Sequence, residues 1–241
     1  MSPNRQSMKK YSQDELAVFL RYSGVFSACD QAEIDYILSR IKTYHYKNET
    51  VIAHREDIGD QVRFVIKGSL NVVATSLDGK EVRFPPIGPH RWMGWMSCFD
   101  SQALSHDWVA TAKSDVIVIP GAVIRKLCEN NPDLYPRVMA EINRQFKLLM
   151  NWTEFVSLHS LNARVRMLIN ILSQISATPM DDKPGWLQVD VTQEHLASFL
   201  NLSRQTANKL LVELEKDDYI SIGYRKILIN ADKLPSLTNQ S

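Results

Sequence analysis

The chain has 241 residues, 44% of them hydrophobic, and a formal net charge of +1. This length can bury one large or two medium cores, and the charge argues against a uniformly basic nucleic-acid-binding protein. Its three widely spaced cysteines exclude a disulfide framework and a four-cysteine metal cluster. The start of the chain does not resemble a signal peptide, and no apolar run reaches the ~20 residues that span a bilayer. We therefore expect a cytoplasmic protein without a membrane segment.

The first half of the chain predicts a flexible arm, two helices and then many short strands. The arm is expected over residues 1–11, and helices over 13–22 and 31–41. From residue 42 to about residue 119, short apolar runs alternate with turn signals, among them the hairpin signal Asp78-Gly79. Regularly spaced short strands favour a small barrel or jelly roll. We expect these elements to form one domain over residues 12–131.

An apolar stripe predicts a long helix within residues 132–160. A stripe that repeats every seven residues over this length favours pairing of the helix with a second copy. A helix buried in a single chain is the alternative, because a stripe does not identify its partner. A further helix over 161–175 and a polar loop over 176–185 begin a C-terminal domain over residues 161–241. The residues expected at the dimer interface are Tyr135, Val138, Met139, Ile142, Phe146, Leu149, Trp152 and Val156.

Residues 191–211 predict two short helices joined by a tight turn. Thr192 and Ser203 can cap the two helices, because their side-chain oxygens accept hydrogen bonds from free backbone N–H groups. Asn201 lies where the turn needs a left-handed residue, which Asn tolerates. The second helix leaves long polar side chains exposed, which suits the base edges of a DNA major groove. An ordinary helical hairpin with a solvated face is the alternative.

Alternating apolar residues around Gly223 predict two further strands, which would form a wing beside the second helix. Residues 191–229 carry five basic and five acidic side chains. Binding of DNA would therefore depend on local phosphate contacts and on dimerisation. The residues expected to contact DNA are Thr192, Gln193, Ser203, Arg204, Gln205, Thr206, Asn208, Lys209, Arg225 and Lys226.

The order of these elements, together with the segment Ser203-Arg204-Gln205-Thr206 and Lys209, resembles the Crp/Fnr superfamily of transcriptional regulators. The resemblance runs from about residue 20 to about residue 230. It implies an α+β protein with a cyclic-nucleotide-binding-like β-roll as sensor domain, a long dimerisation helix and a C-terminal winged helix-turn-helix. It also implies a homodimer that binds a palindromic operator in double-stranded DNA and contacts RNA polymerase.

The same resemblance assigns roles within the DNA-binding residues. Arg204 would bind a guanine edge, and Thr192 and Gln193 would contact phosphates. Gln205 stands where the family usually has Glu, and Lys209 where it has Arg. A Gln side chain suits adenine better than Glu does, and Lys lacks the planar fork of Arg. We therefore expect an operator that differs from the usual family site at these positions.

The effector segment departs from the family pattern. Members that bind cyclic nucleotides have Gly-Glu-Leu followed by Arg-Ser, where this chain has Gly94-Trp95-Met96 and Ser105-His106. The charged groups that hold the ribose and the cyclic phosphate are missing, so cyclic AMP is not expected to be the effector. Either the pocket suits a different, less charged effector, or aromatic side chains fill it and the regulator needs no effector. The candidate pocket residues are Met93, Gly94, Trp95, Met96, Ser97, Ser105 and His106.

Two other functions remain as alternatives. A cupin-like metalloenzyme would have a similar jelly roll, but the histidines lack the His-x-His spacing that its metal requires. A cyclic-nucleotide-binding regulatory protein would not need the predicted DNA-reading helix. Cys98 could sense oxidants, or it could be a buried structural thiol. We predict no catalytic residue, no metal site and no cofactor.

Overall fold

The computed structural model describes residues 11–100 and 102–234. These residues belong to two compact units. The first contains the chain up to Ala74 and from Pro85 to Met150, and the second contains Thr75–Phe84 and the chain from Asn151 onward. Most of the flexible arm predicted over residues 1–11 lies outside the described residues. Its last residue, Tyr11, is held in place, because its hydroxyl donates to Asp115 Oδ2 at 2.7 Å.

Short helices begin the first unit, and each α-helix among them starts at a capping box. Ser12 Oγ accepts from the backbone N–H of Glu15 at 3.2 Å, while the Glu15 carboxylate accepts from the backbone N–H of Ser12 at 2.8 Å. The second α-helix ends at Leu38, earlier than the predicted residue 41, but Ile41 still packs against the core. The elements are α1 (Gln13–Tyr22), η1 (Val25–Ala28) and α2 (Gln31–Leu38).

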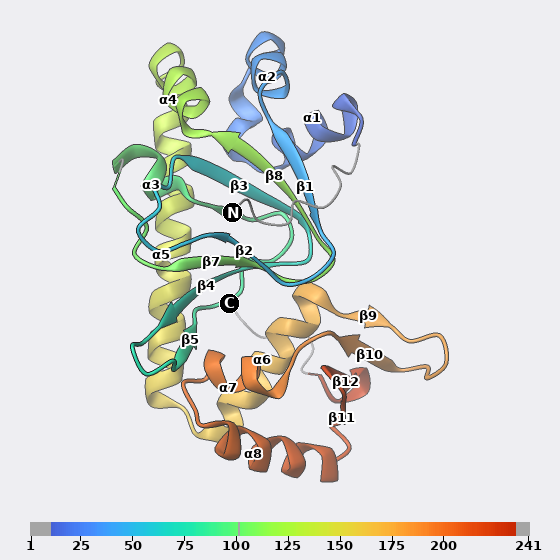
Figure 1. Cartoon of the computed structure of the whole chain (residues 1–241). Coiled ribbons are helices and arrows are strands. Elements are labelled where there is room, and N and C mark those ends of the chain that lie inside the picture. Colours follow the sequence, from blue (N-terminus) through green and yellow to red (C-terminus); the bar gives the residue numbers. More distant parts are fainter. Residues whose placement is uncertain (1–10, 101, 235–241) are drawn as a thin grey trace. The chain divides into compact units, whose positions relative to one another are not determined.

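Two four-stranded sheets form the β-roll. One has the order β1-β8-β3-β6, and α1, α2 and α4 cover its outer side in Figure 1. The other has the order β2-β7-β4-β5. The strands are β1 (Lys42–Tyr46), β2 (Thr50–Ala53), β3 (Gln61–Lys67), β4 (Leu70–Thr75), β5 (Glu81–Arg83), β6 (Trp92–Met93), β7 (Asp107–Ala110) and β8 (Ser114–Pro120).

Alternation along β3 separates two cores. Val62 and Phe64 belong to a cluster that includes the helices, whereas Val65 belongs to a cluster inside the roll. Arg63 therefore lies on the face of β3 that points into the roll, since successive strand residues face opposite sides. β8 is buried along almost its whole length because both of its faces are covered.

Three further helices complete the first unit: α3 (Trp95–Asp100), α4 (Gly121–Asn130) and most of α5 (Leu134–Leu158). The sequence predicts α5 close to these bounds. It does not predict α3, which occupies the segment expected to hold an effector. This helix turns Trp95 into the core beside Phe26 and Trp92.

The second unit has one four-stranded sheet, of order β11-β12-β10-β9, and a core shared with its helices. The sequence predicts residues 176–185 to be a loop throughout, but Thr178 and Pro179 pair with β10. The elements are α6 (Leu161–Ser176), β9 (Thr178–Pro179), β10 (Trp186–Val189), α7 (Gln193–Phe199), α8 (Arg204–Lys216), β11 (Ile220–Gly223), β12 (Lys226–Asn230) and η2 (Ala231–Lys233).

Candidate DNA-binding surface and effector region

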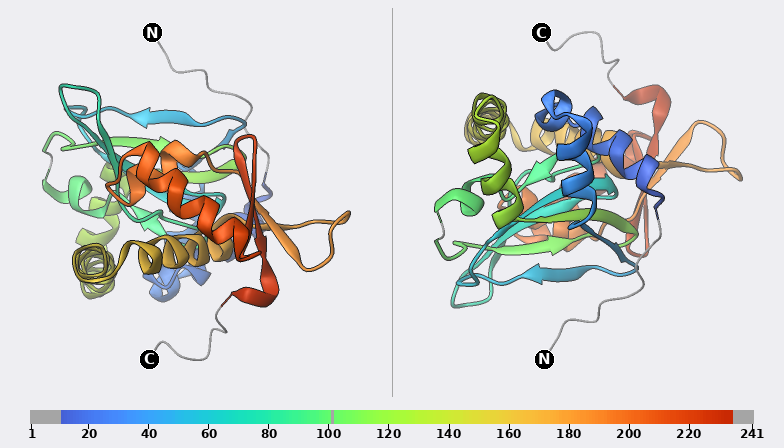
Figure 2. Two further views of the ribbon diagram at one scale, coloured as in Figure 1. Left: turned by 90° about the horizontal axis from the view of Figure 1, so that it is seen from below. Right: turned by 90° about the horizontal axis from the view of Figure 1, so that it is seen from above.

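Local hydrogen bonds set the start of each helix in the α7–α8 pair. Thr192 Oγ1 accepts from the backbone N–H of His195 at 3.1 Å, and Ser203 Oγ accepts from that of Thr206 at 3.1 Å. Asn201, between the helices, has φ +52°, in the left-handed region. The predicted caps and turn residue are therefore confirmed. The left view of Figure 2 shows α8 on the near side of the second unit, with the wing strands next to it.

The apolar and polar faces of α8 are cleanly separated. Ala207, Leu210, Leu211 and Leu214 are buried in the core of the unit. Its outer side is exposed, and within the described residues four polar side chains in its first two turns have no hydrogen-bond or ion-pair partner. They begin in the first turn, where the positive end of the helix dipole favours phosphate. These four residues are Arg204, Gln205, Asn208 and Lys209.

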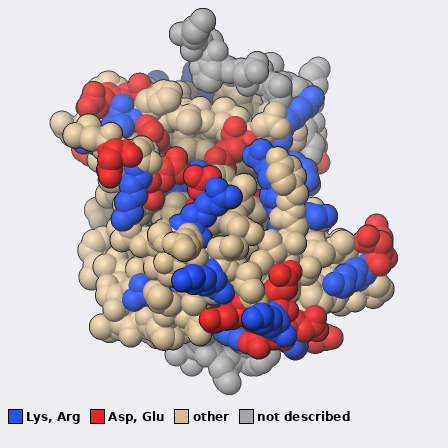
Figure 3. Space-filling view, turned by 60° about the horizontal axis from the view of Figure 1, so that its bottom comes forward, with Lys and Arg blue, Asp and Glu red and all other residues tan. Residues whose placement is uncertain are grey.

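Two acidic residues after this surface are held in contacts inside the unit, whereas Glu213 is exposed and has no partner among the residues described. The Asp217 carboxylate accepts from Arg166 at 3.0 Å, and the Glu215 carboxylate accepts from the backbone N–H of Ile222 at 2.7 Å. Basic and acidic side chains are intermingled over the face shown in Figure 3, rather than gathered into one basic field. This face therefore offers no broad electrostatic attraction for DNA, and phosphate contacts would have to be local.

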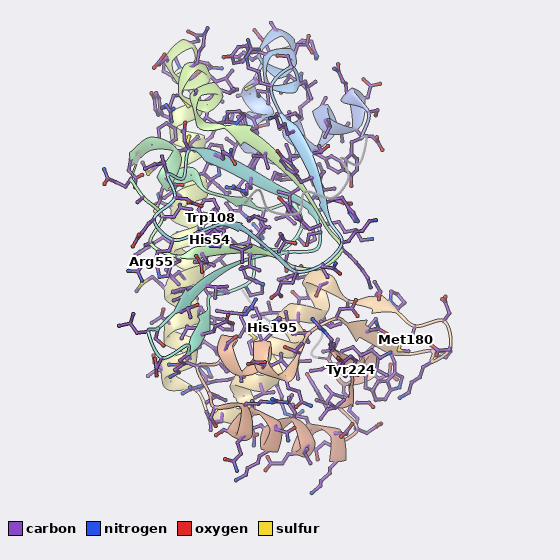
Figure 4. The ribbon with its side chains drawn as sticks, in the orientation of Figure 1. His54, Arg55, Trp108, Met180, His195 and Tyr224 are labelled. Atoms are coloured by element: carbon purple, nitrogen blue, oxygen red, sulfur yellow. The ribbon has the colours of Figure 1, made fainter. Side chains whose placement is uncertain are left out.

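The wing has the predicted strands, with Gly223 paired to Lys226 across the turn. Lys226 Nζ donates to Gln188 Oε1 at 3.2 Å, so this cation is directed back to β10. Arg225 is exposed and has φ +56°. Tyr224, at the tip, is 90% exposed and is labelled in Figure 4. Tyr224 is not among the residues that the sequence predicts to contact DNA. An aromatic residue next to Arg225 in a turn is nevertheless a pattern that indicates an exposed contact residue.

Of the candidate effector residues, the apolar ones are mostly part of the core. Trp95 is 1% exposed, and Met93 lies inside the roll. Met96 is exposed on α3, and Ser97 Oγ donates to the Gly94 carbonyl at 3.1 Å. The structure thus does not bring Met93, Trp95 and Met96 together to line one pocket.

The polar candidates form a pair of their own. Ser105 Oγ and His106 Nδ1 lie 2.7 Å apart. Partial burial, followed by the positive charge of Arg55, lowers the pKa of His106. The lowered pKa favours the neutral imidazole, so His106 is a poor replacement for the cation of a phosphate-binding arginine.

Comparisons with known proteins agree with this arrangement. Residues 43–131 match the family model of the cyclic nucleotide-binding domain, and residues 165–236 match that of the Crp-like helix-turn-helix domain. The chain belongs to the Crp/Fnr family of transcriptional regulators. It is 22% identical over 198 residues to the cAMP-activated global transcriptional regulator CRP of Escherichia coli O157:H7, covering 81% of this chain and 93% of that one.

Other members give the same picture. The CRP-like cAMP-activated global transcriptional regulator of Mycobacterium tuberculosis is 22% identical, covering 88% of this chain and 94% of its own. A solved structure described as a putative Crp/Fnr regulator from Eubacterium rectale has a TM-score of 0.70 at 17% identity, covering 88% and 96%. The c-di-GMP responsive regulator CLP of Xanthomonas campestris has a TM-score of 0.65 at 18% identity, covering 83% and 99%. These similarities confirm the predicted fold class.

The long helix of this Crp/Fnr regulator divides its predicted interface residues into two groups. Val138 is 4% exposed in the core of the first unit, against which Ile142 also packs, and Trp152 packs against the core of the second. Val138 thus offers little surface to a second copy, and Val156 is half-buried. The exposed members are Tyr135, Met139, Phe146 and Leu149.

A redox or metal site in this Crp/Fnr regulator would require a reactive cysteine or a cluster of metal ligands. Cys29, Cys98 and Cys128 are free and buried. Burial raises the pKa of Cys98 to about 11, which disfavours the reactive thiolate. Within residues 11–100 and 102–234, no cluster of three His, Cys, Asp or Glu side chains could hold a metal ion. None of the helices described is long and apolar enough to cross a membrane.

Proposed function

We propose that the protein binds a palindromic operator as a homodimer and reads its sequence with α8. Arg204 donates two hydrogen bonds to a guanine, Gln205 pairs with a neighbouring base edge, and Lys209 contacts a base or a phosphate. Thr192 and Gln193, at the start of α7, hold the DNA backbone together with Arg225 of the wing. Ser203, Thr206, Asn208 and Lys226 complete the contact surface.

One observation carries this proposal. Arg204, Gln205, Asn208 and Lys209 are exposed along one side of α8 and have no partner among the residues described. By contrast, Arg166 and Asp217 of the same unit have exposed side chains that pair with each other. Long side chains left unpaired on a helix of this motif are available for base edges and phosphates.

The homodimer is supported by the exposed apolar side chains of α5. Met139 and Phe146 are more than half exposed and lie seven residues apart, on one face of the helix. Two-fold pairing would deliver two recognition helices to half-sites about 34 Å apart. We propose further that the polar loop within residues 176–185 contacts RNA polymerase, and that the protein works in the cytoplasm as a regulator without enzymatic activity.

We also propose that cyclic AMP is not the effector. The support is that Trp95 is buried in the core, where cyclic-nucleotide-binding members have Glu, and that the lowered pKa of His106 disfavours a positive charge beside Ser105. This proposal has two forms. Either the protein responds to a different effector, or it needs no effector and its activity is set by its own abundance.

The test is selection of bound duplexes from a random DNA pool, followed by binding-shift assays on the selected site. We expect a palindromic site whose recognition is lost in Arg204→Ala, with a penalty of ~1–3 kcal/mol at one base pair of each half-site. Lys216→Ala is the control, because Lys216 is exposed at the far end of the same helix. Failure to select any sequence, or unchanged sequence preference in Arg204→Ala, would refute the assignment.

A further inference from the structure

Arg63 is a cation inside the β-roll. It is 6% exposed and lies on β3 opposite Val118 of β8 and Met93 of β6. Both neighbours belong to the cluster that fills the roll, and Tyr44 and Tyr46 of β1 pack against the same cluster. Arg63 therefore extends into an interior that is otherwise apolar and aromatic.

The guanidinium of Arg63 has little to balance its charge. Its Nη2 donates to Gln61 Oε1 at 3.0 Å, and its Cζ lies 4.8 Å from the centre of the Trp108 ring. Within the part of the chain that the structure describes, no carboxylate lies within 4.0 Å of it, and no other hydrogen bond uses its remaining donors. Burial lowers the pKa of Arg63 to about 10, so it stays charged at pH 7.

Two other arginines of the same unit, Arg125 and Arg144, are each paired with a carboxylate. Arg125 donates twice to the Asp60 carboxylate, at 2.6 and 3.1 Å. Arg144 Nε donates to the Glu141 carboxylate at 3.0 Å. Both are more exposed than Arg63, yet each has its own carboxylate. A buried charge is costly unless it is paired, and Arg63 is buried without a carboxylate within 4.0 Å among the residues described, whereas Arg83, which is 3% exposed, has Glu81 at 3.4 Å.

Trp108 places an aromatic ring beside the guanidinium of Arg63. Its ring lies against Arg63 from the opposite sheet, since Trp108 of β7 pairs with Val72 of β4 and Ala53 of β2. Trp108 is labelled in Figure 4 with His54 and Arg55, which directly follow the strand β2. A planar fork beside an aromatic face suits a ligand that has a carboxylate or similar anionic group on a small organic body.

We propose that Arg63 is the anchor for the anionic group of a small organic effector, whose body packs against Trp108 inside the β-roll. The inference rests on the proposed regulatory function. Of the two forms of that proposal, it requires the one in which the protein responds to an effector. It also places the charged ligand contact on β3, not in the segment around Trp95 that the sequence favours.

The test measures thermal unfolding of the full chain, without DNA, in the presence of matched anionic and neutral compounds. The pairs are acetate with acetamide, benzoate with benzamide, and inorganic phosphate with trimethyl phosphate. We expect at least one anion, and not its neutral partner, to raise the Tm in a saturable way. Fluorine NMR of 5-fluorotryptophan-labelled protein, with Trp108→Phe to assign the signal, should show the Trp108 resonance shifting in the same titration.

Variants separate binding from folding. We expect Arg63→Met to bind the same anion at least ten-fold more weakly, while its own Tm without ligand is equal to or above that of the unsubstituted chain. A purely structural arginine would lower that Tm when replaced. Arg63→Lys keeps the charge without the planar fork and should bind several-fold more weakly. Arg91→Met, at an exposed position, should behave as the unsubstituted chain.

A response to none of the three anions would overturn the inference. Equal shifts by anions and neutral partners, or an undiminished response in Arg63→Met, would do the same. Because the assay contains no DNA, its outcome is independent of whether an operator is found.

Discussion

The backbone N–H of Leu202 donates to the carbonyl oxygen of Ala197 at 2.9 Å, across the turn between α7 and α8. A second bond runs from the N–H of Asn201 to the carbonyl of Ser198 at 3.4 Å. Together they form a Schellman motif, with Asn201 as its left-handed residue. The angle at which α8 leaves α7 therefore depends on a backbone conformation that few side chains tolerate.

Substitutions at Asn201 should follow this requirement. We expect Asn201→Val to lower the free energy of unfolding of the C-terminal unit by ~1–2 kcal/mol, because β-branched residues are strained at positive φ. Asn201→Gly should leave it unchanged within ~0.5 kcal/mol or raise it slightly. Urea unfolding followed by circular dichroism measures both. Equal stability of the Val and Gly variants would show that the turn does not hold this conformation.

The exposed side of α5 leads to a prediction about assembly. Phe146 is 59% exposed in the single chain, so Phe146→Lys should be folded but should dissociate into single chains at micromolar concentration. Desolvating a lysine in an apolar interface is costly. Analytical ultracentrifugation would measure the mass. Asn151→Lys is the control on the same helix, because Asn151 is exposed and lies five residues after Phe146, on a different face of the helix. A two-chain mass for Phe146→Lys would exclude Phe146 from the interface.

Cyclic AMP should leave the Tm of this regulator unchanged. The pKa of His106 is lowered, which disfavours a positive charge at the position corresponding to the family's phosphate-binding pair. A ligand present at ~100 times its Kd would stabilise the protein by ~2.7 kcal/mol, which is a shift of several degrees. Differential scanning calorimetry with cyclic AMP checks this, and a shift of that size would contradict the prediction.

The three cysteines should be unreactive in the folded protein. Burial raises the pKa of Cys29 to about 12, and that of Cys98 and Cys128 to about 11. At pH 8 only roughly one Cys98 in 1,000 carries a thiolate. A thiol-specific chromogenic disulfide should thus react slowly at pH 8 and rapidly once urea unfolds the chain. Fast reaction of one thiol in the native state would instead favour redox sensing at Cys98.

The same shifts give a pH dependence of stability. A thiol whose pKa is higher in the folded than in the unfolded state favours folding fully below the unfolded value, near 9. This contribution is lost as the pH rises towards about 11. Urea midpoints measured between pH 8 and pH 11 should therefore fall less when Cys98 is replaced by Ala than in the unsubstituted chain. An identical fall in both would show that Cys98 does not contribute.

Local features of this chain could be predicted from its sequence. Thr192 and Ser203 each cap the helix expected of them, since the capping hydrogen bond reaches only three residues along the chain. The periodicity of Leu210, Leu211 and Leu214 predicts which face of α8 is buried. For the same reason, the position of Arg204 relative to these leucines is enough to predict that it is exposed and free to contact a base.

The effector region could not be predicted in this way. The segment beginning at Trp95 offers no periodic signal for a helix as short as α3, and nothing in it says that Trp95 would turn towards Phe26, far away in the sequence. Likewise, Arg63 reads as an ordinary polar residue of an alternating strand. The burial of Arg63 depends on Trp108, which lies 45 positions later in the sequence and on a strand of the other sheet.

Sequence alone therefore determined the helix caps, the recognition helix and its free side chains, because these depend on neighbours within one or two helical turns. Only the tertiary structure decided which tryptophans fill the core, which part of α5 remains exposed, and that Arg63 lies among apolar side chains without a carboxylate. These properties depend on which strands pair and in what register, and a shift of one residue along β3 would turn Arg63 from the interior to the other face.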